Sequence, residues 1–162
     1  MSASETPHDG RTDFDFFTGK WKVHHRRLRE RLKGSTAWEE FGGVVTNKKI
    51  LRGLGNLDEV YMERETGPME AVTLRLFDPK SGQWTIHWAD SVTGHLITPM
   101  IGEFRNGRGE FYSQEPFEGK AIFNRFIWSG LTPTSCRWEQ AFSADGGVTW
   151  ETNWVMEFTR LE

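Results

Sequence analysis

The sequence predicts an all-β domain: a single up-and-down antiparallel β-barrel of about nine or ten strands. Runs of strand length alternate with hairpin-type turn sequences along most of the 162 residues. Aromatic residues make up 14% of the chain and hydrophobic residues only 36%. That mixture suits a thin β wall with bulky rings inside better than a helical bundle. No segment has the apolar periodicity of a long helix.

The turn sequences set the order of the predicted elements. A short helical turn at 13–17 would close one end of the barrel, and the first two strands are expected at 21–29 and 38–47. A pair of shorter segments follows around 50–54 and 58–64. Turns rich in Gly, Pro, Asn and Asp separate the remaining strands. These strands are expected at 71–77, 83–89, 100–105, 109–117, 120–129, 135–143 and 149–160.

Gly19, Trp21 and Arg160 are the residues expected to close the barrel. Glycine permits a sharp entry into the first strand, and the indole of Trp21 would then plug one end of the barrel. Arg160 lies at the end of the last strand, on the alternation that its tryptophans share. Its guanidinium would therefore lie over the Trp21 ring, so the first and last strands are expected to pair.

Length and composition indicate one barrel domain, residues 13–162, preceded by a disordered tail, residues 1–12. The tail is polar and lacks an apolar signal core, and no later apolar run approaches a membrane span. Cys136 is the only cysteine, which excludes a disulfide framework and indicates a small packed residue. We therefore expect a cytoplasmic protein without a membrane partner.

Charge is unevenly distributed along the chain. The net charge is −3, but residues 20–33 hold seven Lys or Arg and one Glu. A basic segment can bind nucleic acid, yet the acidic remainder would repel phosphate and no nucleic-acid motif is present. We therefore expect no nucleic-acid partner and interpret the segment as a charged strand edge that resists aggregation.

Strand alternation predicts which side chains point into the barrel. In the last strand, Trp150, Thr152 and Trp154 share the inward face, and Asn153 takes the other. Both faces of strand 120–129 are partly apolar, so its inward face stays open. An apolar and aromatic set with a few polar anchors is typical of a small-molecule site, although a filled barrel has the same composition. The predicted ligand contacts are His25, Arg27, Asn124, Phe126, Trp138, Gln140, Thr152 and Trp154.

His25 and Arg27 are the titratable members of this set. His25 is either a hydrogen-bonded wall residue or a ligand contact and general base. Arg27, if it points inward, needs an anion because an unpaired buried charge is costly. Glu40 on the next strand or a carboxylate of the ligand would supply that anion. The five histidines show no metal spacing, so no metal or cofactor is predicted.

The residues Ser143-x-Asp145-x-Gly147-x-Thr149-Trp150 fit the Asp-box, a motif that is repeated in sialidases. The motif forms a tight hairpin in which the Ser and Asp side chains form hydrogen bonds with the backbone of the turn. A single copy in 162 residues indicates a structural hairpin and not a glycosidase. No nucleophile elbow, P-loop or dinucleotide-binding glycine pattern is present.

Three stretches resemble an uncharacterised group of bacterial lipocalin-like proteins of the calycin superfamily: FDFFTGKW at 14–21, GNLDE at 55–59 and DGGVTWETNW at 145–154. The similarity spans nearly the whole chain from residue 13. It implies a calycin-like barrel with a central cavity, and the group has no established activity to carry over. Fatty-acid-binding proteins of this superfamily have a helical lid after the first strand, for which residues 30–37 are too short.

Three functions fit these observations. The leading hypothesis is a binding protein for a small, largely apolar, aromatic or amphipathic molecule, with His25 and Arg27 at an anionic head group. Phe126, Trp138 and Trp154 would surround its body. The second hypothesis is a cofactor-independent lyase, isomerase or cyclase with His25 as acid and base. The third is a filled barrel whose mid-chain strands form a protein-interaction surface or a homodimer.

Overall fold

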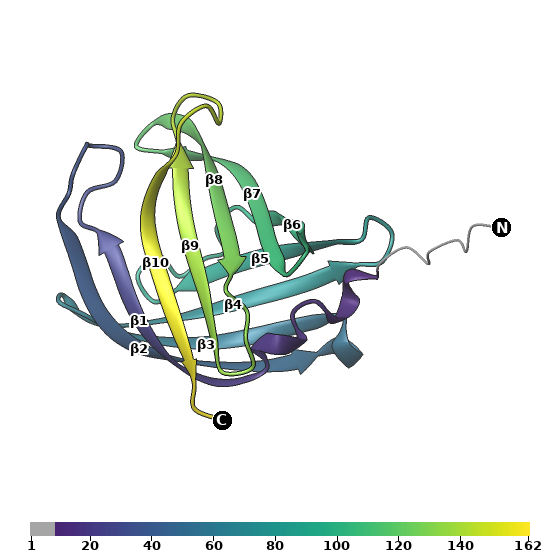
Figure 1. The fold of residues 1–162 in the computed structure, drawn as a ribbon. Helices are drawn as coiled ribbons and strands as arrows, with labels where there is room; N and C mark the ends of the chain where they lie inside the picture. The colour runs from purple at the N-terminus through teal and green to yellow at the C-terminus, as the bar shows by residue number, and fades with distance from the viewer. Residues whose placement is uncertain (1–8) are drawn as a thin grey trace.

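The computed structural model describes residues 9–162 as a closed antiparallel barrel in which each strand pairs with its neighbours in the chain and the last pairs with the first (Figure 1). This confirms the predicted all-β up-and-down barrel. No helix in the described residues is long and apolar enough to cross a membrane. The elements of residues 9–162 are η1 (Gly10–Thr12), η2 (Asp15–Phe17), β1 (Gly19–Leu28), β2 (Trp38–Ile50), η3 (Leu51–Gly53), β3 (Gly55–Arg64), β4 (Gly67–Asp78), β5 (Gln83–Asp90), β6 (Met100–Arg105), β7 (Arg108–Phe117), β8 (Lys120–Ser129), β9 (Ser135–Ser143) and β10 (Glu151–Arg160), where η marks a 3-10 helix.

The prediction of a separate short strand around 50–54 is wrong. β2 continues to Ile50 as one long strand, and η3 then turns the chain into β3. Leu51 and Arg52 have φ values of 52° and 56°, and these left-handed conformations do not fit a strand. Leu51 is exposed in this turn. Its apolar side chain therefore resembles part of a strand in the sequence but does not join the core.

The structure describes only residues 9–12 of the predicted tail. Residues 1–8 of the tail lie outside the described residues. Residues 9–12 form an ordered turn instead, because Gly10 is buried and its carbonyl accepts a 3.0 Å hydrogen bond from Trp84 Nε1. Asp9 caps the turn by accepting from the Arg11 backbone N–H. A Cβ at position 10 would lie 3.1 Å from Asp13 Oδ2, so glycine permits this close approach.

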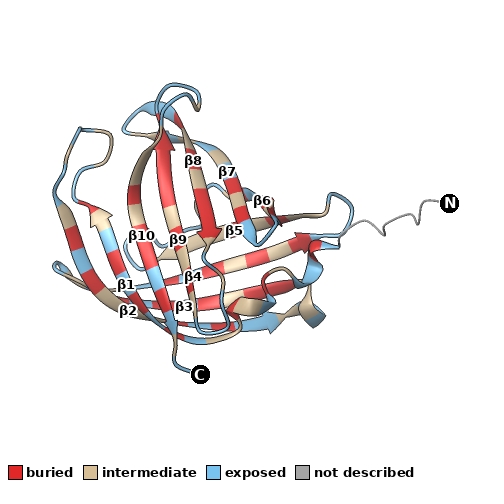
Figure 2. Ribbon diagram, in the orientation of Figure 1, coloured by how far each residue is buried: buried red, intermediate tan, exposed pale blue. Residues whose placement is uncertain are grey.

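Aromatic rings fill the base of the barrel, the end where η2 meets the start of β1 and the end of β10. Phe17 stacks on Trp21 with ring centroids 5.5 Å apart, and Trp21 Nε1 donates to the Phe17 carbonyl at 3.0 Å. Trp128 approaches Phe17 edge-on at 4.8 Å. All three side chains are buried, and Figure 2 shows buried residues alternating along β8, β9 and β10. The rings form a packed plug at this end.

Arg160 ties the last strand to the first across the base. Its guanidinium lies 4.2 Å from the Trp21 ring centroid, the contact that the sequence analysis predicted. It also donates hydrogen bonds to the Phe16 and Thr18 carbonyls at 2.6 and 2.8 Å. Gly19 has a φ of 125°, and a Cβ there would lie 2.7 Å from Arg160 Nη1. Glycine is therefore the residue that admits this closure.

The wall is weakest between β5 and β6, toward the end of the barrel opposite the base. Three residue pairs join these strands, from Trp84↔Gly102 to Ile86↔Met100. Beyond them the loop 91–99 lies along β5, with the Ile97 backbone N–H donating to the Trp88 carbonyl at 2.9 Å. This end, which we call the mouth, is therefore bordered by strand ends and loops, whereas the base is sealed by rings.

Candidate functional site

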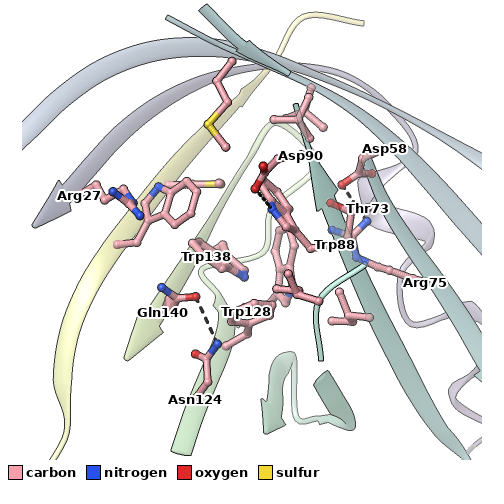
Figure 3. A pocket seen from close by; sticks show the side chains of 18 of the residues that line it. Arg27, Asp58, Thr73, Arg75, Trp88, Asp90, Asn124, Trp128, Trp138 and Gln140 are labelled. Carbon is pink, nitrogen blue, oxygen red and sulfur yellow. Dashed lines mark hydrogen bonds and ion pairs between the residues drawn. The ribbon is translucent and has the colours of Figure 1, made fainter. Parts of the chain in front are cut away.

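A cavity of about 410 Å³ lies inside the barrel between the aromatic base and the mouth (Figure 3). This volume falls in the range of about 300–1,000 Å³ that small-molecule sites occupy. Much of the lining is apolar, with Phe126, Trp138 and Trp154 on one side and Val60 and Ile86 among the others. The cavity therefore has the size and the surface to hold an apolar organic molecule.

Three arginines from separate segments line the cavity at its mouth: Arg27 from β1, Arg31 from the loop 29–37 and Arg64 from the end of β3. The Arg27 guanidinium lies 5.2 Å from the Trp154 ring centroid. Arg31 lies over Phe142 at 5.3 Å. The Leu32 backbone N–H donates to Glu151 Oε1 at 2.9 Å, which fixes the loop that carries Arg31.

The charges of these arginines are only partly compensated. Arg64 Nη2 is bonded to Glu39 Oε2 at 2.7 Å. In residues 9–162, by contrast, neither Arg27 nor Arg31 forms an ion pair with a carboxylate, and the buried Arg27 Nε has no hydrogen-bond acceptor. Burial lowers the pKa of Arg27 to about 10, and the neighbouring cations Arg31 and Arg64 act in the same direction, against the smaller opposing effect of Glu39 and Asp90. The mouth is therefore a desolvated site that favours an anion.

Carboxylates near the mouth are already held by other groups. Asp90 accepts from Trp88 Nε1 at 2.9 Å and from the Thr93 backbone N–H at 2.9 Å. The predicted partner of Arg27, Glu40, lies outside the barrel, 3.2 Å from His24 Nε2. That prediction is wrong because the hairpin register pairs Arg27 with Glu39 and Arg26 with Glu40. Neighbours along a strand face opposite sides of the sheet.

A row of polar side chains crosses the wall of the cavity at mid-height. Glu115 Oε1 accepts from Asn124 Nδ2 at 3.3 Å, Asn124 Nδ2 also approaches Gln140 Oε1 at 3.4 Å, and Gln140 Nε2 donates to Asn153 Oδ1 at 2.9 Å. Glu115, Asn124 and Gln140 line the cavity. Of this row the sequence analysis predicted Asn124 and Gln140 as ligand contacts.

A β-bulge in β10 reverses the predicted faces of Thr152 and Asn153. The register of β10 against β9 shifts between Thr152 and Trp154, so Asn153 turns inward and is fully buried. Thr152 pairs with Ala141, whose other neighbour is Arg125 on the outer face. The predicted placement of Thr152 in the cavity is therefore wrong, because an extra residue in a bulge inverts the alternation before it.

A buried ion pair forms the deepest polar part of the lining. Arg75 Nη1 lies 2.9 Å from Asp58 Oδ2, and Asn47 and Asn56 complete the network by hydrogen bonds to Asp58 and Arg75. Burial raises the pKa of Asp58 against the opposing effect of Arg75. Sequence reasoning missed this pair. Strand alternation could have predicted that Asp58 is buried, because Asp58 shares a face of β3 with the buried Val60 two positions later.

His25 shares the inward face of β1 with Trp21 and Val23 but is not among the residues that line the cavity. It is fully buried, stacks on Phe41 at 4.5 Å, and its Nδ1 accepts a 3.1 Å hydrogen bond from Trp154 Nε1. Because the indole N–H is only a donor, the proton of the neutral imidazole belongs on Nε2. Burial lowers the pKa of His25 to about 3, and the neighbouring charges of His24 and Arg64 act in the same direction. His25 therefore orients Trp154, and its contact with a ligand stays a prediction.

The structure thus brings most of the predicted set together. Around the cavity lie Arg27, Asn124, Phe126, Trp138, Gln140 and Trp154. Their roles in binding stay predictions. Arg31 and Arg64, which the sequence analysis did not include, join Arg27 because the β1–β2 loop and the end of β3 meet at the mouth. Among residues 9–162 there is no group of three or more His, Cys, Asp or Glu placed to hold a metal ion.

Comparison with known proteins identifies the fold. Neither a protein-family model nor a curated protein matches the chain. Among solved structures, the S-type phycobiliprotein lyase CPES from Guillardia theta superposes with a TM-score of 0.61 and 9% identity, covering 96% of this chain and 94% of that one. A fluorescence-activating β-barrel designed de novo gives a TM-score of 0.49 and 14% identity, covering 94% of this chain and 98% of that one.

At 9% identity the likeness to the lyase shows the fold alone: the chain forms a lipocalin-like barrel. The designed barrel superposes less well and adds no argument. Membership in the bacterial group that the sequence motifs resemble stays a prediction.

Proposed function

We propose that the protein binds a small, largely apolar or aromatic molecule with an anionic head group inside the barrel. The observation that carries this proposal is the pair Arg27 and Arg31, which line a cavity of about 410 Å³ and form no ion pair with a carboxylate in the described chain, where the neighbouring carboxylates act only at longer range. The head group would lie at the mouth, and the body would extend along the aromatic wall.

Desolvation of the arginines gives the energetic reason for an anion at the mouth. A guanidinium that has lost water without gaining an anion destabilises the fold, and a bound carboxylate or sulfonate relieves that cost. Arginine suits this role because its planar guanidinium pairs with both oxygens of a carboxylate. The aromatic body contributes through the apolar area that it buries against Trp138 and Trp154.

The same structure disfavours His25 as an acid or base. An imidazole whose pKa is lowered to about 3 stays neutral near pH 7 and is a weak base. It is also bonded to Trp154 and is not among the residues that line the cavity. We therefore place binding ahead of a cofactor-independent reaction at this residue.

The test compares a charged and a neutral probe of the same shape. We expect 2-naphthoate to bind to the wild-type protein and naphthalene-2-carboxamide to bind more weakly, as measured by isothermal titration calorimetry. Arg27→Gln should weaken naphthoate binding about tenfold or more, the value of a charge-assisted hydrogen bond. Arg26→Gln is the matched control, since Arg26 contacts Glu40 on the outer face, and it should change affinity less than about twofold.

Two results would contradict the proposal. One is that neither probe binds to the wild-type protein. The other is that Arg27→Gln and Arg26→Gln weaken naphthoate binding equally, which would place the anion outside the cavity.

A further inference from the structure

The polar row across the cavity wall restricts the chemistry of the guest further. We infer that the guest also carries a hydrogen-bond donor, a hydroxyl or N–H group, which binds to Asn124 Oδ1 while its anionic group binds at Arg27. This inference rests on the proposed function and defines the substrate class more narrowly: a hydroxylated or N–H-bearing aromatic acid.

Glu115 fixes the direction of the whole row. An ionised carboxylate only accepts hydrogen bonds, and Glu115 accepts from Ser113 Oγ at 3.0 Å and from Asn124 at 3.3 Å. The amide of Asn124 must therefore direct its Nδ2 toward Glu115. Its Oδ1 is turned away as a consequence.

Gln140 continues the same direction. Its Oε1 lies 3.4 Å from Asn124 Nδ2, and its Nε2 donates to Asn153 Oδ1 at 2.9 Å. Both polar groups of Gln140 are thus occupied, and neither can serve Asn124 Oδ1. Flipping either amide would set two donors, or two acceptors, against each other.

Asn124 Oδ1 is consequently left without a partner in residues 9–162, although the Asn124 side chain is only 2% exposed and lines the cavity. A buried carbonyl oxygen without a donor is costly to the fold. The neighbouring lining is Phe126 and Trp138. Phenylalanine has no donor, and the indole N–H of Trp138 forms no hydrogen bond to Asn124 Oδ1 in the described residues.

The register fixes the spacing between the two polar ends. Arg27 pairs with Trp154 on β10, and Trp154 pairs with Gln140 on β9. Gln140 in turn pairs with Phe126 on β8, two residues after Asn124. Three strand spacings therefore separate Arg27 from the strand of Asn124 along the wall, about 14 Å. Figure 3 shows Gln140 and Asn124 below Trp138 in the view, with Arg27 to the left. Because the Arg27 and Asn124 side chains both line the cavity and shorten the gap between the strands, the expected guest has its acid and its donor at opposite ends of a fused ring system.

The experiment uses three probes of one shape: 2-naphthoate, 6-hydroxy-2-naphthoate and 6-methoxy-2-naphthoate. The wild-type affinities, measured by isothermal titration calorimetry, should place the hydroxy acid at least fivefold tighter than naphthoate. The methoxy acid, which accepts but does not donate, should gain nothing. Asn124→Leu, nearly the same size, should abolish the preference for the hydroxy acid while naphthoate still binds. Arg26→Gln should leave the preference unchanged.

The outcomes test the donor on the guest and the proposed binding function separately. Equal affinity for the three probes overturns the donor inference and leaves the proposed function standing, as does a methoxy acid that binds as tightly as the hydroxy acid. Absence of binding by all three probes overturns both. A hydroxyl preference that persists in Asn124→Leu overturns the assignment to Asn124. The wild-type series decides the donor question even if the variant fails to fold.

Discussion

The base and the mouth of the barrel both place an arginine over a tryptophan, but only the base satisfies its arginine. Arg160 lies 4.2 Å from the Trp21 ring centroid and donates to the carbonyls of Phe16, Thr18 and Pro133. Arg27 lies 5.2 Å from the Trp154 ring centroid, and its buried Nε has no acceptor in the described chain. The same pair of residue types therefore closes one end of the wall and leaves the other end able to receive an anion.

The largest expected effect compares the two tryptophans. Trp21→Ala removes a fully buried ring from the base and should lower the free energy of unfolding by about 3–5 kcal/mol. Trp154→Ala removes a partly buried ring that borders the cavity and should cost about 1–2 kcal/mol. Urea unfolding followed by circular dichroism measures both. Equal losses would mean that the base is no more tightly packed than the mouth.

The second prediction compares the two arginines. Arg160→Gln loses hydrogen bonds to backbone carbonyls and should destabilise the fold by about 2–3 kcal/mol. Arg27→Gln removes an unpaired, desolvated charge, so its cost should stay below about 1 kcal/mol in the absence of ligand. Thermal unfolding of both variants tests this. A loss at Arg27 as large as that at Arg160 would show that Arg27 has a structural partner.

The smallest effect concerns His25 and pH. Its folded pKa of about 3 lies below the ordinary value of 6.5, so below pH 6.5 the unfolded chain takes up a proton that the folded chain does not. Stability should therefore fall as the pH falls, by about 1.5 kcal/mol between pH 6.5 and pH 5 from this residue alone. His25→Gln should lose this part of the pH dependence of stability. His24→Gln, at an exposed neighbouring residue, should retain most of it, because burial is the larger cause of the lowered His25 pKa. An equal pH dependence of the free energy of unfolding in the two variants would contradict the lowered pKa of buried His25.

Much of the base could be predicted from the sequence because its signals are local. Gly19 and Trp21 lie two residues apart, and the alternation of β10 places Arg160 opposite Trp21. Turn sequences and strand alternation therefore determine the closure without knowledge of distant contacts.

The mouth could be predicted only in part because its residues depend on register and irregularity. The loop 29–37 sets which glutamate faces Arg27, and a shift by one residue exchanges Glu39 for Glu40. Likewise the bulge that turns Asn153 inward has no clear mark in the sequence, since an extra residue in a strand looks like any other. Arg64 reaches the mouth because the end of β3 lies two strands from β1, with Glu39 of β2 between them.

A crystal structure of the protein grown with 2-naphthoate tests the central claim most directly. We expect the carboxylate within about 3 Å of the Arg27 guanidinium, the range of a charge-assisted hydrogen bond, and the ring system against Trp138 inside the barrel. Density for the ring on the outer surface, or a cavity whose side chains close together with no room for the ring, would contradict the account.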